Sequence, residues 1–98
     1  MASVSVTKSI GAQNTFSDAV QLTGYFNISI SGTFSATVFV QRSTDNSTWR
    51  DVDSFTAAAE EVGFEPEVMY YRIGVKTGGY ASGTADVRLG YDPQNRLN

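Results

Sequence analysis

The chain has 98 residues, of which 41% are hydrophobic and 12% aromatic, and its formal net charge is -3 at pH 7. This length fits one domain with its own core and leaves little room for a substrate pocket. The absence of Cys and His excludes disulfides, a thiolate nucleophile and Cys-based zinc sites, and it removes the commonest general base and metal ligand. We expect a protein that binds macromolecules without catalysis, and without a metal, cofactor or small-molecule substrate.

The basic residues are scattered between Lys8 and Arg96 and form no cluster. Phosphate backbones are bound by concentrated basic faces, so nucleic acid is not an expected partner. No apolar run approaches the ~18 residues of a membrane span, and the start Met-Ala-Ser-Val lacks the basic flank and apolar stretch of a signal peptide. We therefore expect no membrane contact, and a chain that is made and kept in a cytosol or in something assembled there.

Alternation of apolar and polar residues recurs along the chain and favours strands. Residues 3–7 predict a first strand and residues 19–22 a short second one. Residues 26–31 alternate cleanly before Gly32, which predicts a half-buried strand with a break after it. The segment 36–42 is apolar on both faces, which predicts a central strand or a contact surface.

Residues 44–47 are four turn-favouring residues and predict a hairpin, whose second arm is 48–53. We expect Trp49 to cover one end of the core. Oxygen-rich loops can hold calcium, but the acid spacing in this hairpin matches no calcium loop. Turn and solvent-facing carboxylates are expected at Asp45, Asp51 and Asp53.

The alternation fails between residues 55 and 67. Ala57 to Glu61 is the only run of good helix formers, and Gly63 and Pro66 end it. We predict a surface connection with one helical turn. A pair of acids could serve glycoside hydrolysis, but nothing aims two of them into a cleft, so we expect a solvated loop or an interaction edge. The carboxylates concerned are Glu60, Glu61, Glu65 and Glu67.

The strongest strand signal covers residues 68–76, and residues 82–91 alternate in the same way. The pair Gly78 and Gly79 between them predicts a turn, and hence a second hairpin. The side chains expected to face inward in its first arm are Met69, Tyr71, Ile73 and Val75.

Six or seven short strands with turn signals about every ten residues predict an all-β fold, an antiparallel β-sandwich. An Ig-like arrangement is expected first and a jelly-roll-like one next. We expect a single domain over 1–98, with a possible extended arm at 1–14 and a tail at 92–98. These two ends are candidates for strand addition onto a partner.

Two groups of residues are candidate partner contacts besides Glu60 and Glu61. Arg72 and Arg88 lie on outward strand faces and predict a cross-strand charge ladder, or contacts to an acidic partner. Three aromatic residues fall at predicted turns or loops, where they either fold back over the sandwich ends or anchor an interface. They are Phe34, Phe64 and Tyr80.

Several short motifs share a pattern of hairpins and core residues. They are Ser31-Gly32-Thr33-Phe34, Val40-Gln41-Arg42-Ser43-Thr44-Asp45 with Thr48-Trp49, Tyr71-Arg72-Ile73, and Ser82-Gly83-Thr84. In these motifs the chain resembles small β-sandwich structural proteins of tailed bacteriophages. The resemblance covers about 24–89 and carries no binding residues over.

The resemblance implies a capsid decoration (cement) protein, which binds the outside of the major capsid shell, associates with itself on the particle and stabilises the shell. A tail, fibre or head-to-tail connector component is the alternative within the same family. A third possibility is an adhesion or carbohydrate-binding module, with stacking platforms at Trp49, Tyr70 and Tyr80.

Overall fold

The computed structural model describes residues 4–93, and over them the chain is all-β with antiparallel sheets and no helix. This confirms the predicted fold class, a β-sandwich. Seven strands form one continuous sheet, and β4 and β8 form a second, smaller one. The strands are β1 (Val4–Ile10), β2 (Thr15–Phe16), β3 (Val20–Ser31), β4 (Phe34–Ala36), β5 (Val38–Ser43), β6 (Arg50–Phe55), β7 (Ala59–Val75), β8 (Tyr80–Gly83) and β9 (Ala85–Tyr91).

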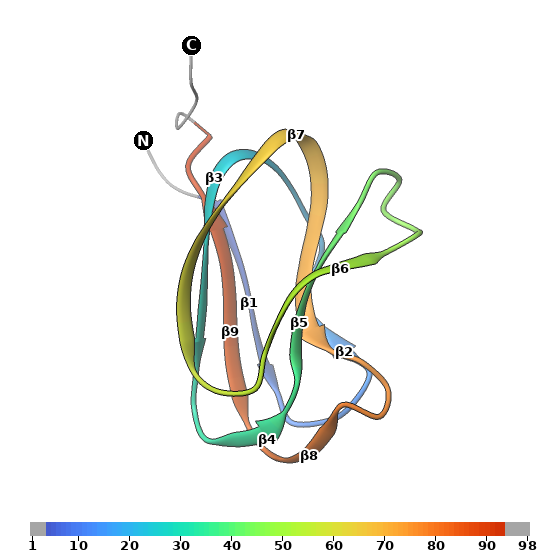
Figure 1. Cartoon of the computed structure of the whole chain (residues 1–98), viewed down its shortest axis with the longest axis vertical. Helices are drawn as coiled ribbons and strands as arrows, with labels where there is room; N and C mark the ends of the chain where they lie inside the picture. The colour runs from blue at the N-terminus through green and yellow to red at the C-terminus, as the bar shows by residue number, and fades with distance from the viewer. Residues whose placement is uncertain (1–3, 94–98) are drawn as a thin grey trace.

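Two long strands, β3 and β7, generate both layers of the sandwich. They run side by side and bend together over one end of the molecule (Figure 1), and their register shifts at the bend, between Leu22 and Gly24. The first layer contains β1, β9, the second half of β3 and the first half of β7. The second layer contains β2, the first half of β3, the second half of β7, β5 and β6.

The core lies between the two layers and is filled by alternate residues of each strand. The predicted inward face of residues 68–76 is confirmed, and Val38 and Val40 are completely buried in the layer beside it. Trp49 is not a core residue, so its expected place over the core end was wrong. The buried hydrophobic residues are Ile10, Val20, Leu22, Phe26, Ile28, Ile30, Val38, Val40, Met69, Tyr71, Ile73, Val75, Ala85, Val87 and Leu89.

The acidic connection predicted between residues 55 and 67 is instead the first half of β7, so the helical turn at 57–61 is wrong. Ala59 to Glu65 pair in register with β3. One helical turn fixes several dihedral angles for a single hydrogen bond. Pairing with β3 instead gives this segment a series of interstrand hydrogen bonds. Tertiary pairing therefore overrides the local helix propensity.

The second predicted hairpin is also wrong. Gly78 and Gly79 do form a turn, in which the Gly79 amide donates to the Lys76 carbonyl at 3.0 Å. The chain then enters β8, which pairs with β4, and β9 pairs with β1 and β3. Since β3 lies between β7 and β9 in the sheet order, the two expected arms are not neighbours.

The two Ser-Gly-Thr segments meet at the end of the sandwich opposite the bend. The Thr84 amide donates to the Thr33 carbonyl at 3.1 Å. Gly32 and Gly83 both have positive φ, and a Cβ at either one would collide with the backbone of the other segment. Glycine is required at both positions by conformation and by close approach.

The expected N-terminal arm is largely part of the fold. Residues 4–10 form β1 and pair with β9 along its whole length, so strand addition there would use only the outer edge of β1. Residues 11–14 of that arm connect β1 to β2. Residues 1–3, and most of the expected tail, residues 94–98, lie outside the described residues.

Candidate interaction surface

A buried carboxylate holds the bend of β7. Glu65 is 2% exposed, and both of its oxygens accept hydrogen bonds from Arg42, Nε to Oε1 at 2.9 Å and Nη2 to Oε2 at 3.0 Å. Tyr71 donates to Oε1 at 2.7 Å and the Glu67 amide to Oε2 at 3.1 Å. These donors satisfy the carboxylate, so Glu65 is a structural residue and not part of an exposed acidic loop.

Four apolar side chains are exposed beside this bend. Val62 is 73% exposed, Val68 59%, Phe64 48% and Tyr25 41%. Tyr25 and Phe64 are directly opposite each other in the β3–β7 ladder, and their ring centroids are 5.0 Å apart. We call these four residues the apolar strip. Most of the large exposed hydrophobic residues of the described chain lie in it, so it is the strongest candidate contact surface.

The outer face of the first layer continues beside the strip in short polar side chains. Hydroxyl groups alternate with charges here: Ser9 donates to Asp86 at 2.6 Å and Ser29 donates to Glu60 at 2.6 Å. Arg88 donates through Nη1 to Oδ1 of Asn27 at 2.6 Å. This face is therefore rich in hydroxyl groups, with the apolar strip along one side.

Arg72 and Arg88 do not form the predicted charge ladder, because they lie on the outer faces of different layers. Arg72 is in the second-layer half of β7, where its guanidinium carbon is 4.0 Å from the ring centroid of Phe16 and 4.4 Å from that of Trp49. Its Nε donates to Gln41 at 2.8 Å, and burial lowers the pKa of its guanidinium. Arg72 thus holds two aromatic rings on this face and is not a free cation.

Phe34 and Tyr80 fold back onto the core, whereas Phe64 does not. All three lie in strands and not in the predicted loops. The Tyr80 hydroxyl donates to the Gly83 carbonyl at 2.8 Å. Of the three aromatic candidates, Phe64 is exposed, whereas Phe34 and Tyr80 are half-buried.

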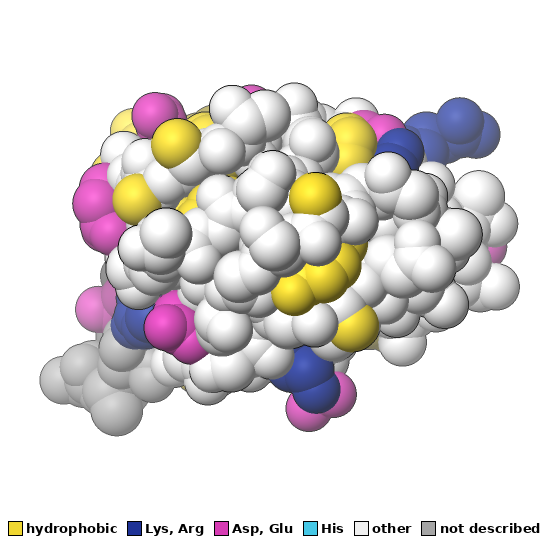
Figure 2. Space-filling model, turned by 90° about the horizontal axis from the view of Figure 1, so that it is seen from below, with side chains coloured by type: hydrophobic (Ala, Val, Ile, Leu, Met, Phe, Trp, Pro, Cys, Tyr) yellow, Lys and Arg dark blue, Asp and Glu magenta, His cyan; other side chains and the backbone are white. Residues whose placement is uncertain are grey.

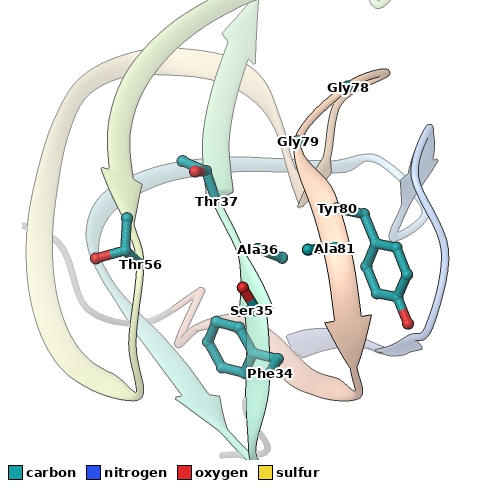
Figure 3. A pocket seen from close by; sticks show the side chains of 9 residues that line it. All are labelled: Phe34, Ser35, Ala36, Thr37, Thr56, Gly78, Gly79, Tyr80 and Ala81. Carbon is teal, nitrogen blue, oxygen red and sulfur yellow. The ribbon is translucent and has the colours of Figure 1, made fainter.

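Phe34 and Tyr80 belong to the end of the sandwich opposite the bend, where a hollow of about 400 Å³ opens (Figure 3). Hydrophobic atoms lie at the centre of this end and charged side chains lie at its rim (Figure 2). No charged side chain lines the hollow. Its lining is Phe34, Ser35, Ala36, Thr37, Thr56, Gly78, Gly79, Tyr80 and Ala81.

Three edge strands carry a charged residue on their core-facing side. Glu61 of β7 is opposite Ile28, Lys8 of β1 is opposite Val87, and Asp53 of β6 is opposite Val40, and each of these partners is buried. All three charged residues are exposed. Inward-pointing charges on edge strands oppose pairing with another chain, because pairing would bury them. Glu60, in contrast, points outward beside Ser29.

Asp45 has the turn role that the sequence predicts. Its Oδ1 accepts from the amides of Thr48 at 2.8 Å and Ser47 at 2.9 Å, and these bonds lower the pKa of Asp45. Asp51 pairs with Lys76 at 2.7 Å. Within residues 4–93, no group of three or more acidic side chains is arranged to hold a metal ion.

No helix that could cross a membrane occurs among the described residues. No protein-family model, curated protein or solved structure matches the chain.

Proposed function

We propose that the protein is a virion structural protein that binds the outer surface of a major capsid shell and stabilises it, with the apolar strip as the contact. The observation that carries the proposal is the exposure of the strip, from 41% at Tyr25 to 73% at Val62. Contiguous exposed apolar residues with a polar surround mark sites of protein interaction. The capsid as partner comes from the resemblance to phage sandwich proteins.

The fold is compatible with a protein that is added in many copies to a preformed shell. A continuous sheet bent into two layers supplies a rigid body, and the contact strip lies on strands β3 and β7, not on a loop. The charges on the core-facing side of edge strands, such as Glu61, disfavour open-ended association between free copies. Such copies stay separate until a shell provides the complementary surface.

The test uses phage particles made without this chain, to which purified protein is added back. Wild-type protein should bind in hundreds of copies and raise the temperature at which the particles release DNA. Val62→Lys, which places a charge in the strip, should weaken binding by about tenfold or more. Val52→Lys is the matched control, because Val52 is 46% exposed on β6 in the other layer.

Three results would contradict the proposal. Equal DNA release with and without the protein would remove the stabilising role. Occupancy of about six to twelve copies at one vertex would identify the alternative, a ring-forming tail or connector component. Binding of wild type but not Trp49→Ala to a glycan array would favour the carbohydrate-binding alternative, although one face of Trp49 already packs on Arg72.

A further inference from the structure

Arg88 is held in a fixed position on the outer face of the first layer. A Cβ at Gly90 would lie 2.7 Å from Nη1 and 2.9 Å from Cζ of Arg88, so the guanidinium rests directly on the backbone of Gly90. Asn27, which accepts the hydrogen bond from Arg88, is opposite Gly90 on one side and Val62 on the other. Because Gly90 has no side chain, the guanidinium of Arg88 can lie over its backbone. The guanidinium thereby lies in the cross-strand row that leads to Val62 of the apolar strip.

The cation borders a hollow of about 210 Å³, whose lining includes Tyr25, Val62 and Arg88. A guanidinium has five N–H donors, and Arg88 uses one in its bond to Asn27. The ion pairs among the described residues are Arg42 with Glu65 and Lys76 with Asp51, so Arg88 has no carboxylate within pairing distance. Asp92 also lines the hollow and has an interaction of its own.

We propose that this hollow takes an acidic side chain of a partner protein, whose carboxylate pairs with Arg88 while apolar neighbours pack on Val62 and Tyr25. The planar guanidinium matches a carboxylate with two parallel hydrogen bonds. Arg and Tyr, which line this hollow together, are among the residue types that most often carry the binding energy of an interface. This inference rests on the proposed function, because it gives the chemistry of the capsid surface that the strip would meet.

Two variants test whether Arg88 acts by its position or only by the net charge of the protein. One reverses the charge of Arg88, and the other displaces its guanidinium. On particles made without the chain, Arg88→Glu should weaken binding by roughly 100-fold. Gly90→Ala keeps the charge of Arg88 but displaces its guanidinium from the backbone of residue 90, and it should weaken binding by about tenfold. Arg50→Glu is the matched control, since Arg50 is an exposed residue of β6 in the other layer, and it should bind like wild type.

A second probe does not depend on the capsid. Immobilised short peptides with a central Glu, Gln or Lys between Leu and Phe residues are incubated with wild type and Arg88→Glu. Wild type should retain the Glu peptides best, and Arg88→Glu should lose that preference. If capsid binding fails but the preference for Glu holds, the proposed function is wrong and the carboxylate site stands. Equal retention of Glu and Gln peptides, or capsid binding unchanged by Arg88→Glu, overturns the inference.

Discussion

Tyr71 donates a hydrogen bond of 2.7 Å to Oε1 of Glu65, six residues before it in the same strand. Glu65 lies at the bend of β7 and Tyr71 lies in its second-layer half, opposite Val20. The Tyr71 ring also packs against Phe26 of the first layer, with centroids 4.8 Å apart. The side chain of Tyr71 therefore links the bend to both layers.

Glu65 should make the fold sensitive to acid. Burial alone would raise its pKa, but the hydrogen bonds from Arg42, Tyr71 and the Glu67 amide outweigh burial and lower the pKa below 4.5. A carboxyl group whose pKa is lower in the folded state contributes stability above its unfolded pKa and loses it as the pH falls through the folded value. The free energy of unfolding of wild type should therefore drop below about pH 4.5.

The contribution of the Glu65 carboxylate to stability can be measured with Glu65→Gln, by denaturant unfolding at neutral and acid pH. The variant leaves Arg42 facing an amide and should cost about 3 kcal/mol at neutral pH, with a smaller further loss in acid than wild type. Glu61→Gln removes an exposed carboxylate from the same strand and should change the neutral value little. A Glu65→Gln protein as stable as Glu61→Gln would show that the buried pair does not hold the bend.

The phenol of Tyr71 should produce a separate loss of stability in alkali. Burial, together with the neighbouring carboxylate of Glu65, raises its pKa from 10.0 to about 12. An acid whose pKa is raised on folding contributes stability below its unfolded pKa, and this stability is lost as the pH rises from 10.0 to about 12. Tyr71→Phe should cost about 1–2 kcal/mol at neutral pH and should lack this alkaline loss. Tyr25→Phe, at an exposed site, should keep it; alkaline curves of the same shape for both variants would contradict the assignment.

The inward face of β7 could be predicted only where it is apolar. From Met69 to Val75 alternate residues are buried, and the sequence shows it. Before the bend the core-facing positions are Glu61, Gly63 and Glu65, which give no hydrophobic pattern. The reason is that the space over Gly63 is filled by the ring of Phe26, whose Cζ would lie 2.5 Å from a Cβ there, and the charge of Glu65 is satisfied by a residue far away in sequence.

Neither the strands that pair with β9 nor the position of Arg88 could be predicted from the local sequence. The glycines at 78 and 79 correctly predict a turn, but a turn does not say which strand receives the returning chain. Phe64 was a candidate because it is an aromatic residue at a predicted loop. The segment is instead a strand, and the exposure of Phe64 depends on which face of β7 it occupies. Likewise, Arg88 was predicted to face outward, but the packing of its guanidinium on Gly90 is seen only in the structure.

Neighbouring carboxylates of β7 should have different effects on self-association. Glu61 is on the core-facing side of an open edge and Glu60 is on the outer face, opposite Ser29. Replacing Glu61 with Thr removes the charge that a second strand would have to bury, so Glu61→Thr should form larger species at high concentration. Glu60→Thr removes the same charge from the same strand and should sediment like wild type. The edge argument fails if the two variants sediment alike.

Arg72 should stabilise the outer face of the second layer and should control the fluorescence of Trp49, the single Trp of the chain. Arg72→Met removes the two cation–π contacts and the bond to Gln41, which should cost about 1–3 kcal/mol and shift the Trp49 emission. Arg88→Met is the control, because it removes an arginine from the other layer without touching an aromatic stack, and it should leave the emission unchanged. Arg72→Lys should restore stability only in part, since an ammonium cannot lie flat between the rings of Phe16 and Trp49 as a planar guanidinium does. Emission and stability unaltered in Arg72→Met would mean that the stack is not formed in solution.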